Sequence, residues 1–282
     1  MKILLTGGTG FIGRNIVEKF NVKYSVFSPS RIELDLLDEN ALKEYIISNK
    51  ISVIIHSANT NHVTHPKDAD SMLDFNLRMF FNICRCSDLV NKIIYFGSGA
   101  EYDARYYEPK MKEIYLGKHI PVDPYGFSKY IMAYSAENSD NIYELCLFGV
   151  YGKYEEWRRR FISNVIYQCM NCSEISINHN QIFDYLYIED LISVVEWFLQ
   201  NEPRFHRYNV CSSQPVELMD IANYIRHMLN KNIVISKKED IDANYYLGDN
   251  SRLLAELKGF ELTEWKTGVR KMIEYYGVEG FS

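Results

Sequence analysis

The first twenty residues place a glycine-rich turn between a strand pattern and a helix pattern. Residues 2–6 are apolar, glycines recur at intervals of three, and apolar residues from 11 to 20 then follow a helical period. Such a turn lets the backbone approach a pyrophosphate, which the N–H groups at the helix N-terminus also favour. A tight turn without a ligand is the alternative. The pattern predicts a dinucleotide-binding loop made of Gly7, Gly10, Phe11, Ile12 and Gly13.

Strand and helix patterns alternate over the first half of the chain. We expect strands at 24–27, 51–56, 92–96 and 143–148, with helices at 39–49, 70–90 and 125–137 between them. This alternation predicts an α/β fold, a doubly wound parallel (Rossmann) sheet that forms a dinucleotide-binding domain over residues 1–150.

The regular alternation of strand and helix patterns ends after about residue 151. Helices are expected at 156–170, 188–200, 216–229 and 263–276, and strands only at 175–178 and 208–210. We therefore expect residues 151–282 to form mainly a smaller C-terminal substrate-binding lobe, with about 182–210 returning to the Rossmann domain.

Charge and hydropathy argue against two classes of partner. The chain has 31 Lys and Arg residues against 37 Asp and Glu, a formal net charge of −6, and the one clear basic run is Arg158 to Arg160. We expect no nucleic-acid surface, and this run is either solvated or paired with a nucleotide diphosphate. No apolar run reaches the roughly 18 residues of a membrane span, and no cationic leader opens the chain. A cytoplasmic protein without a membrane partner is expected.

The cysteine and histidine patterns do not indicate a metal site. The six cysteines are too few for a disulfide scaffold in a chain of 282 residues, so we expect reduced thiols. Cys169 and Cys172 form a lone CxxC without a second pair. His56 is expected in the core, and His62 and His65 are expected in a loop.

The end of the second expected strand indicates which nicotinamide cofactor fits. NAD sites usually place a carboxylate there, whereas NADP sites place small residues and an arginine for the 2′-phosphate. This chain has Ser28, Ser30 and Arg31, and an arginine fork binds a phosphate dianion strongly. Asp35 and Leu36 follow as candidates for the adenine edge. The sequence favours NADP(H), with NAD(H) possible if Arg31 is only a solvated surface residue.

A candidate catalytic set follows from two further positions. Tyr125 and Lys129 lie four residues apart in an expected helix, which places both side chains on one face. Ser98 comes directly after the strand expected at 92–96, and ligands of such sheets bind outside the carboxyl ends of the strands. These three residues are therefore predicted to meet beside the cofactor.

Other motifs, taken with these residues, give the chain a resemblance to a known family. They are residues 55–58 (IHSA) after the third strand, Asn76 in the expected helix 70–90, residues 147–152 (LFGVYG) and residues 183–190 (FDYLYIED). In this combination the chain resembles the extended short-chain dehydrogenase/reductase family, the NAD(P)-dependent sugar-nucleotide epimerases, dehydratases and reductases.

The resemblance implies roles for these residues. Ser98 would hydrogen-bond the reacting substrate oxygen, Tyr125 would exchange its proton, and Lys129 would assist Tyr125 and hold the nicotinamide ribose. Ser57, Ala58 and Asn76 would join the cofactor site. The family also implies a nucleotide-sugar substrate and a homodimer formed through helices 70–90 and 125–137.

Departures from the family pattern narrow the expected reaction. In the 4,6-dehydratases the two residues after the catalytic Ser or Thr are Asp and Glu, but this chain has Gly99 and Ala100. Reductases that also epimerise C3 and C5 have a Cys and a His where this chain has Ala100 and Tyr154. The Asn that often precedes Val-Tyr-Gly is Gly149. Elimination and C3/C5 epimerisation therefore lack their acid and base.

The sequence thus favours redox chemistry at one carbon. The leading hypothesis is an NADPH-dependent reductase of the C4 keto group of a nucleotide-linked 4-keto-6-deoxy sugar, for surface polysaccharide biosynthesis. An NAD-retaining nucleotide-sugar C4 epimerase would need the same three residues. A non-catalytic nicotinamide-binding sensor of this fold would not need them.

Overall fold

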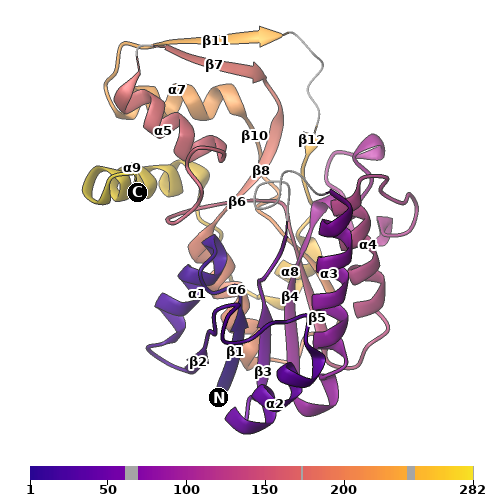
Figure 1. The fold of residues 1–282 in the computed structure, drawn as a ribbon. Coiled ribbons are helices and arrows are strands. Elements are labelled where there is room, and N and C mark those ends of the chain that lie inside the picture. Colours follow the sequence, from indigo (N-terminus) through magenta and orange to yellow (C-terminus); the bar gives the residue numbers. More distant parts are fainter. Residues whose placement is uncertain (61–68, 173, 240–244, 282) are drawn as a thin grey trace.

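A parallel sheet forms the base of the first lobe in this computed structural model, which describes residues 1–60, 69–172, 174–239 and 245–281. Its strand order is β2-β1-β3-β4-β5-β9, and each neighbouring pair is parallel (Figure 1). The strands are β1 (Lys2–Thr6), β2 (Ser25–Phe27), β3 (Val53–His56), β4 (Lys92–Ser98), β5 (Ile142–Leu147) and β9 (Arg207–Val210).

Helices cover both faces of this sheet because successive strand residues point to opposite sides. In β1, Ile3 and Leu5 pack with α1 and α6, whereas Leu4 between them packs with α2, α3 and α4. The covering helices are α1 (Phe11–Phe20), α2 (Glu39–Asn49), α3 (Ala69–Cys84), α4 (Pro124–Ala136) and α6 (Ile188–Gln200). The prediction of a doubly wound parallel sheet is confirmed.

The second lobe contains short strands and three helices, among the described residues. One mixed sheet joins β6 (Gly149–Tyr151), β8 (Ile182–Tyr187), β10 (Pro215–Glu217) and β12 (Tyr245–Tyr246), and a parallel pair joins β7 (Glu174–His179) to β11 (Val234–Glu239). The helices are α5 (Phe161–Asn171), α7 (Leu218–Met228) and α9 (Trp265–Glu279). The short helix α8 (Ser251–Glu256) packs against β9 of the first sheet instead, where Arg252 donates to the Arg207 carbonyl at 3.0 Å.

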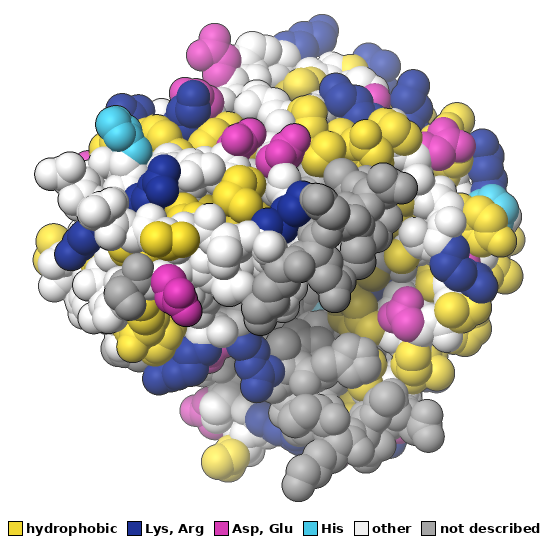
Figure 2. Space-filling model, turned by 90° about the horizontal axis from the view of Figure 1, so that it is seen from above, with side chains coloured by type: hydrophobic (Ala, Val, Ile, Leu, Met, Phe, Trp, Pro, Cys, Tyr) yellow, Lys and Arg dark blue, Asp and Glu magenta, His cyan; other side chains and the backbone are white. Residues whose placement is uncertain are grey.

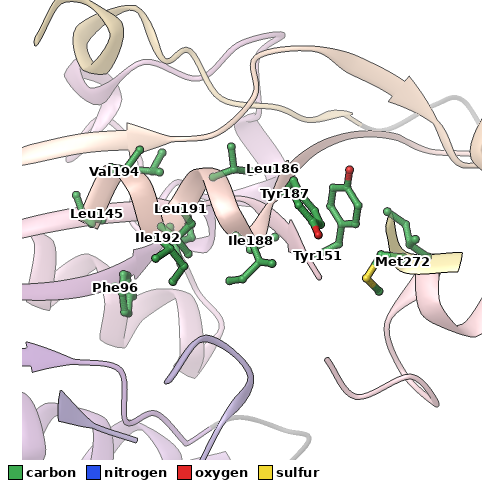
Figure 3. Packing of buried hydrophobic residues seen from close by; sticks show 14 of the residues in the cluster. Phe96, Leu145, Tyr151, Leu186, Tyr187, Ile188, Leu191, Ile192, Val194 and Met272 are labelled. Carbon is green, nitrogen blue, oxygen red and sulfur yellow. The ribbon is translucent and has the colours of Figure 1, made fainter. Parts of the chain in front are cut away.

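The chain passes from the first lobe into the second and back. Within residues 182–210, β8 belongs to the second-lobe sheet, whereas α6 covers the first sheet and β9 pairs with β5 at its edge. Figure 3 shows the resulting continuous core, in which Leu191 and Ile192 of α6 lie near Phe96 and Leu145 of the sheet. The two lobes therefore share one hydrophobic core.

A buried ionic cluster lies under the edge formed by β5 and β9. The Arg207 side chain, 1% exposed, donates to Glu144 Oε2 at 2.8 Å and to Glu101 Oε1 at 2.6 Å, and both carboxylates are fully buried. It also donates to Glu137 Oε1 at 2.9 Å. Burial, together with the neighbouring Glu101 carboxylate, raises the pKa of Glu144. The cluster places one cation against two carboxylates that are removed from water.

Several expected boundaries differ from the structure. The helix expected at 70–90 ends at Cys84, because the chain then turns tightly to enter β4. The helix expected at 156–170 begins at Phe161, and the buried Glu155 side chain accepts the Ser163 backbone N–H at 3.3 Å in its first turn. Strands β6, β8, β10, β11 and β12 and helix α8 were not expected. None of the helices in the described part of the chain has both the length and the hydropathy to cross a membrane.

Candidate active site

The glycine turn packs closely against the loop after β3. Gly7 has a φ of 72°, and a Cβ there would lie 2.6 Å from the Ala58 backbone nitrogen. A Cβ on Gly13 would lie 2.2 Å from the Gly7 carbonyl oxygen, so α1 begins directly against the turn. β1 and β3 are adjacent although β2 lies between them in sequence, which makes this the topological switch point where such sheets bind ligands.

A cavity of about 320 Å³ opens at this switch point. Most of its wall is apolar, with Leu34, Phe75 and Met79 among its residues. The predicted cofactor residues that line it are Gly7, Ser30, Arg31, Asp35, Leu36 and Ala58. The glycine turn, the helix N-terminus and this mainly apolar cavity fit the adenosine half of a dinucleotide.

The other predicted cofactor residues of this region do not line the cavity. The Ser28 hydroxyl fills the space beside Gly8, since a Cβ on Gly8 would lie 1.8 Å from it. The buried Asn76 side chain accepts from the Thr60 backbone N–H at 2.8 Å and donates to the Thr60 carbonyl at 2.9 Å. Thr60 itself lines the cavity. The remaining residues of this group are Gly10, at the N-cap of α1, Phe11 and Ile12, in its first turn, and Ser57, whose backbone contacts Gly7.

Charged side chains of both signs lie in or next to the lining of the cavity. Arg31 is exposed and makes no salt bridge with a carboxylate of the described residues. The Glu33 carboxylate instead accepts the Ser30 backbone N–H at 2.7 Å, and this bond lowers the pKa of Glu33. Asp35 accepts the Leu37 backbone N–H at 3.0 Å. The guanidinium of Arg31 thus stays available to a ligand.

The structure brings the three predicted catalytic residues to the carboxyl end of β4. Helix α4 begins with an Asp123 side-chain cap and a proline at its first position. The buried Lys129 ammonium donates to the Phe96 carbonyl at 2.8 Å and lies 5.8 Å from the centre of the Tyr125 ring. Ser98 is buried, and its hydroxyl oxygen accepts the Ala100 backbone N–H at 3.2 Å.

His56 lies in the core beside this group. Its Nδ1 is 2.8 Å from the Thr6 hydroxyl, and burial together with the Lys129 charge lowers the pKa of His56 to about 3. The side chain is therefore neutral at physiological pH. His62 and His65 lie outside the described residues, and no group of three or more metal-binding side chains occurs within them.

Three aromatic residues surround Gly99, and of these only Phe148 belongs to a motif noted in the sequence. A Cβ on Gly99 would lie 2.8 Å from two carbons of the Phe148 ring and 2.9 Å from the Tyr246 hydroxyl oxygen. The Tyr107 hydroxyl donates to the Gly99 carbonyl. Position 99 therefore has no room for the carboxylate that a dehydratase places there.

Tyr154 and Gly149, which also depart from the family pattern, are each fixed by their surroundings in the fold. Tyr154 faces α1, where its hydroxyl donates to Glu18 at 3.0 Å and its ring stacks under Arg14. A Cβ on Gly149 would lie 2.3 Å from the Asp184 carbonyl oxygen, which excludes an asparagine in this backbone position.

The Arg158 to Arg160 segment precedes α5. The Arg158 guanidinium lies over the Trp157 ring and 3.6 Å from Glu156, so this arginine is partly engaged within the chain. Figure 2 shows basic side chains scattered among acidic and uncharged ones over the face seen from above.

A family model and a curated relative match this chain. The model describes the NAD dependent epimerase/dehydratase family and matches residues 3–211. GDP-L-colitose synthase of Yersinia pseudotuberculosis is 24% identical over 302 aligned positions, which cover 98% of this chain and 98% of that protein. The resemblance noted in the sequence is thereby confirmed.

Solved structures share the fold over nearly the whole chain. GDP-mannoheptose C4 reductase from Campylobacter jejuni, with NADP bound, gives a TM-score of 0.82 at 20% identity and covers 98% of each chain. UDP-glucose 4-epimerase from Thermotoga maritima, with UDP-glucose, gives 0.82 at 19% identity and covers 98% of this chain and 99% of its own. Because the family model matches most of its length, this protein is an enzyme of the NAD dependent epimerase/dehydratase family.

Proposed function

We propose that this enzyme reduces the C4 keto group of a nucleotide-linked 4-keto-6-deoxy sugar with NADPH, in the cytoplasm and for surface polysaccharide biosynthesis. The observation that carries the proposal is the crowding of Gly99 by Phe148 and Tyr246, which excludes an acid beside Ser98. Ala100 and Tyr154 supply no acid or base for C3 or C5 either, since the Tyr154 hydroxyl is directed to Glu18. Redox chemistry at one carbon remains.

The proposed mechanism uses three side chains of the chain itself. The nicotinamide, when bound, supplies the hydride. Ser98 donates a hydrogen bond to the keto oxygen and holds it beside Tyr125. Tyr125 gives its phenolic proton to that oxygen as it gains charge. The buried ammonium of Lys129, near the Tyr125 ring, stabilises the resulting phenolate.

Nicotinamide absorbance tests this function directly. CDP-, dTDP-, GDP- and UDP-linked 4-keto-6-deoxyhexoses are each mixed with the enzyme and NADPH. Stoichiometric NADPH oxidation with one of them, giving a 4-hydroxy sugar, is the expected result. Interconversion of 4-hydroxy epimers without net NADPH consumption would instead establish the NAD-retaining epimerase. Tight nicotinamide binding without conversion of any sugar would point to a sensor.

Arg31 is the proposed determinant of NADPH preference. Since a hydrogen bond to a charged group contributes about 1.5–3 kcal/mol, Arg31→Ala is expected to weaken NADPH binding about tenfold to a hundredfold. NADH has no 2′-phosphate, so its dissociation constant should hardly change. Fluorescence titration of both cofactors measures the difference. The exposed Lys258, which lies outside the cavity lining, provides the control Lys258→Ala. Equal binding of both cofactors by the wild type, unchanged in Arg31→Ala, would remove the assignment.

We also propose a homodimer formed through α3 and α4. Aromatic side chains of Phe127, Tyr130 and Tyr134 follow one another along α4, and Tyr134 is 58% exposed. On α3, Phe75 and Met79 line the cofactor cavity, so they are not available to a second subunit. Light scattering at micromolar concentration should give twice the chain mass of 33.1 kDa. A monomer mass would contradict the dimer.

A further inference from the structure

The turn that follows β2 offers donors to an anion, and a carboxylate of the chain itself already occupies one of them. Residues 29–31 line the cofactor cavity, at the strand end where the 2′-phosphate of NADPH is expected. The Ser30 backbone N–H donates to Glu33 Oε2 at 2.7 Å, and the Ser30 hydroxyl oxygen accepts the Glu33 N–H at 3.4 Å. We refer to residues 30–33 as the Ser30 turn.

The Ser30 turn does not depend on the Glu33 carboxylate for its shape. The two reciprocal bonds between Ser30 and Glu33 form a capping box, which usually starts a helix, but the next helix, α2, begins only at Glu39. The turn is closed by its own backbone, because the Ser30 carbonyl accepts the N–H groups of Glu33 at 3.1 Å and Leu34 at 3.0 Å. Leu34 is anchored in the core. The carboxylate can therefore leave the Ser30 N–H while the turn stays in place.

The Glu33 side chain carries a negative charge beside the arginine that is proposed to bind the phosphate. The bond from the Ser30 N–H, together with the Ser30 hydroxyl, lowers the pKa of Glu33, so the carboxylate is ionised at neutral pH. Glu33 and Arg31 are both exposed, and within the described residues no salt bridge joins them. An anion and a cation thus lie two residues apart, next to the same backbone donor.

The donor inventory of the turn makes this arrangement selective. A backbone N–H has one proton, so it serves one strong acceptor at a time. Glu33 must leave the Ser30 N–H before a phosphate can use it, and its charge repels a phosphate close by. The 2′-hydroxyl of NADH is neutral and meets no such repulsion. Glu33 therefore opposes one of the two cofactors and not the other.

We propose that Glu33 is a cofactor-specificity residue, whose carboxylate competes with a 2′-phosphate for the Ser30 N–H and so limits the preference for NADPH that Arg31 creates. This inference rests on the proposed function for the assignment of Arg31 to the 2′-phosphate. It places two opposing charges in one turn, so replacing either residue shifts the choice between NADPH and NADH, in opposite directions.

Two nucleotides that differ in the 2′-phosphate test the proposal. Adenosine 2′,5′-bisphosphate carries this group, and adenosine 5′-monophosphate lacks it. Glu33→Gln keeps the size of the side chain and an acceptor oxygen for the Ser30 N–H but removes the charge. At low ionic strength it should tighten binding of the bisphosphate about tenfold and leave the monophosphate unchanged. Glu44→Gln removes the same charge at an exposed position of α2 and should change neither dissociation constant.

Isothermal titration calorimetry gives both dissociation constants. An equal gain for both nucleotides would indicate a change in the turn itself and would overturn the proposal. A loss of bisphosphate affinity, or no change, would show that Glu33 does not compete with the phosphate and would overturn it too. Titration with NADPH and NADH repeats the comparison with the complete cofactors, and Glu33→Gln should raise the ratio of their affinities by a similar factor.

These equilibrium measurements need no sugar nucleotide, so they separate this inference from the proposed function. If no sugar is reduced but Glu33→Gln selectively tightens bisphosphate binding, the proposed reaction fails and the role of Glu33 stands. If NADPH is oxidised with a sugar but Glu33→Gln gives no selective gain, the proposed function stands and the role of Glu33 is removed.

Discussion

Tyr125→Phe is expected to lower turnover about 10²- to 10⁴-fold, the loss typical of a removed general acid. Its ring would remain in place on α4, so NADPH should bind with an unchanged dissociation constant. The deficit should appear in kcat and in kcat/KM alike, because the proton is transferred only as the transition state forms. Single-turnover measurement of NADPH oxidation, under saturating sugar nucleotide, separates this chemical step from binding and release.

The neighbouring Tyr130 provides a matched control. It lies on the same helix and is also half-buried, but it follows Lys129 and contacts Phe127 and Tyr134 rather than the end of β4. Tyr130→Phe should therefore retain the wild-type kcat. An undiminished rate in Tyr125→Phe, or a comparable fall in both variants, would remove Tyr125 from the mechanism.

Arg207→Met should lower the free energy of unfolding by about 3–5 kcal/mol, because it leaves two buried carboxylates without their cation. The methionine fills similar volume, so the loss reports the charge rather than a cavity. Burial already raises the pKa of Glu144, and removing the Arg207 charge, which lowers that pKa, would raise it further in the folded state. A group whose pKa is higher in the folded state favours folding at low pH and opposes it as pH rises. The deficit should accordingly be larger at about pH 8 than at about pH 5.5.

Urea unfolding at both pH values measures this effect. Arg204 is three residues away and exposed, and Arg204→Met should change stability by less than about 0.5 kcal/mol. Adding Glu144→Gln to Arg207→Met should recover part of the loss, since it removes one of the uncompensated charges. A pH-independent deficit that Glu144→Gln does not reduce would indicate that the cluster acts through packing alone.

The elements that the sequence predicted well have long and regular patterns. Expected helices at 39–49 and 188–200 match α2 and α6 at both ends, and the expected strands of the first sheet differ from the observed ones by at most two residues. Asp38 caps α2 through its side chain, which is a local signal. The start of α5 was misjudged because Trp157 and the arginines after it extend the helical pattern, while its boundary depends on the buried Glu155.

The unexpected strands are short and depend on pairing with distant segments. β12 has two residues, Tyr245–Tyr246, and exists because it lies beside β8. No period can be read from two residues. Local patterns are equally uninformative about long-range contacts in the site. Motifs in the sequence indicated Ser98, Tyr125 and Lys129, but the contact of Tyr246 with Gly99 joins residues 147 positions apart. Of the 22 tyrosines, local sequence does not single out the one whose hydroxyl lies beside Gly99.

The late position of β9 in the sequence affects how the first sheet can fold during synthesis. During synthesis the N-terminal part of a chain emerges first and starts to fold. When residue 150 has been added, β5 is still an open sheet edge, and Glu144 on it has no cation beside it. One later segment both covers the open edge and supplies the cation, because β9 pairs with β5 and carries Arg207. An open edge can pair with another molecule, and here it stays open until some sixty further residues have been synthesised. A charged side chain on an open edge opposes pairing with a second molecule, and the strand that closes this edge brings the guanidinium that Glu144 contacts.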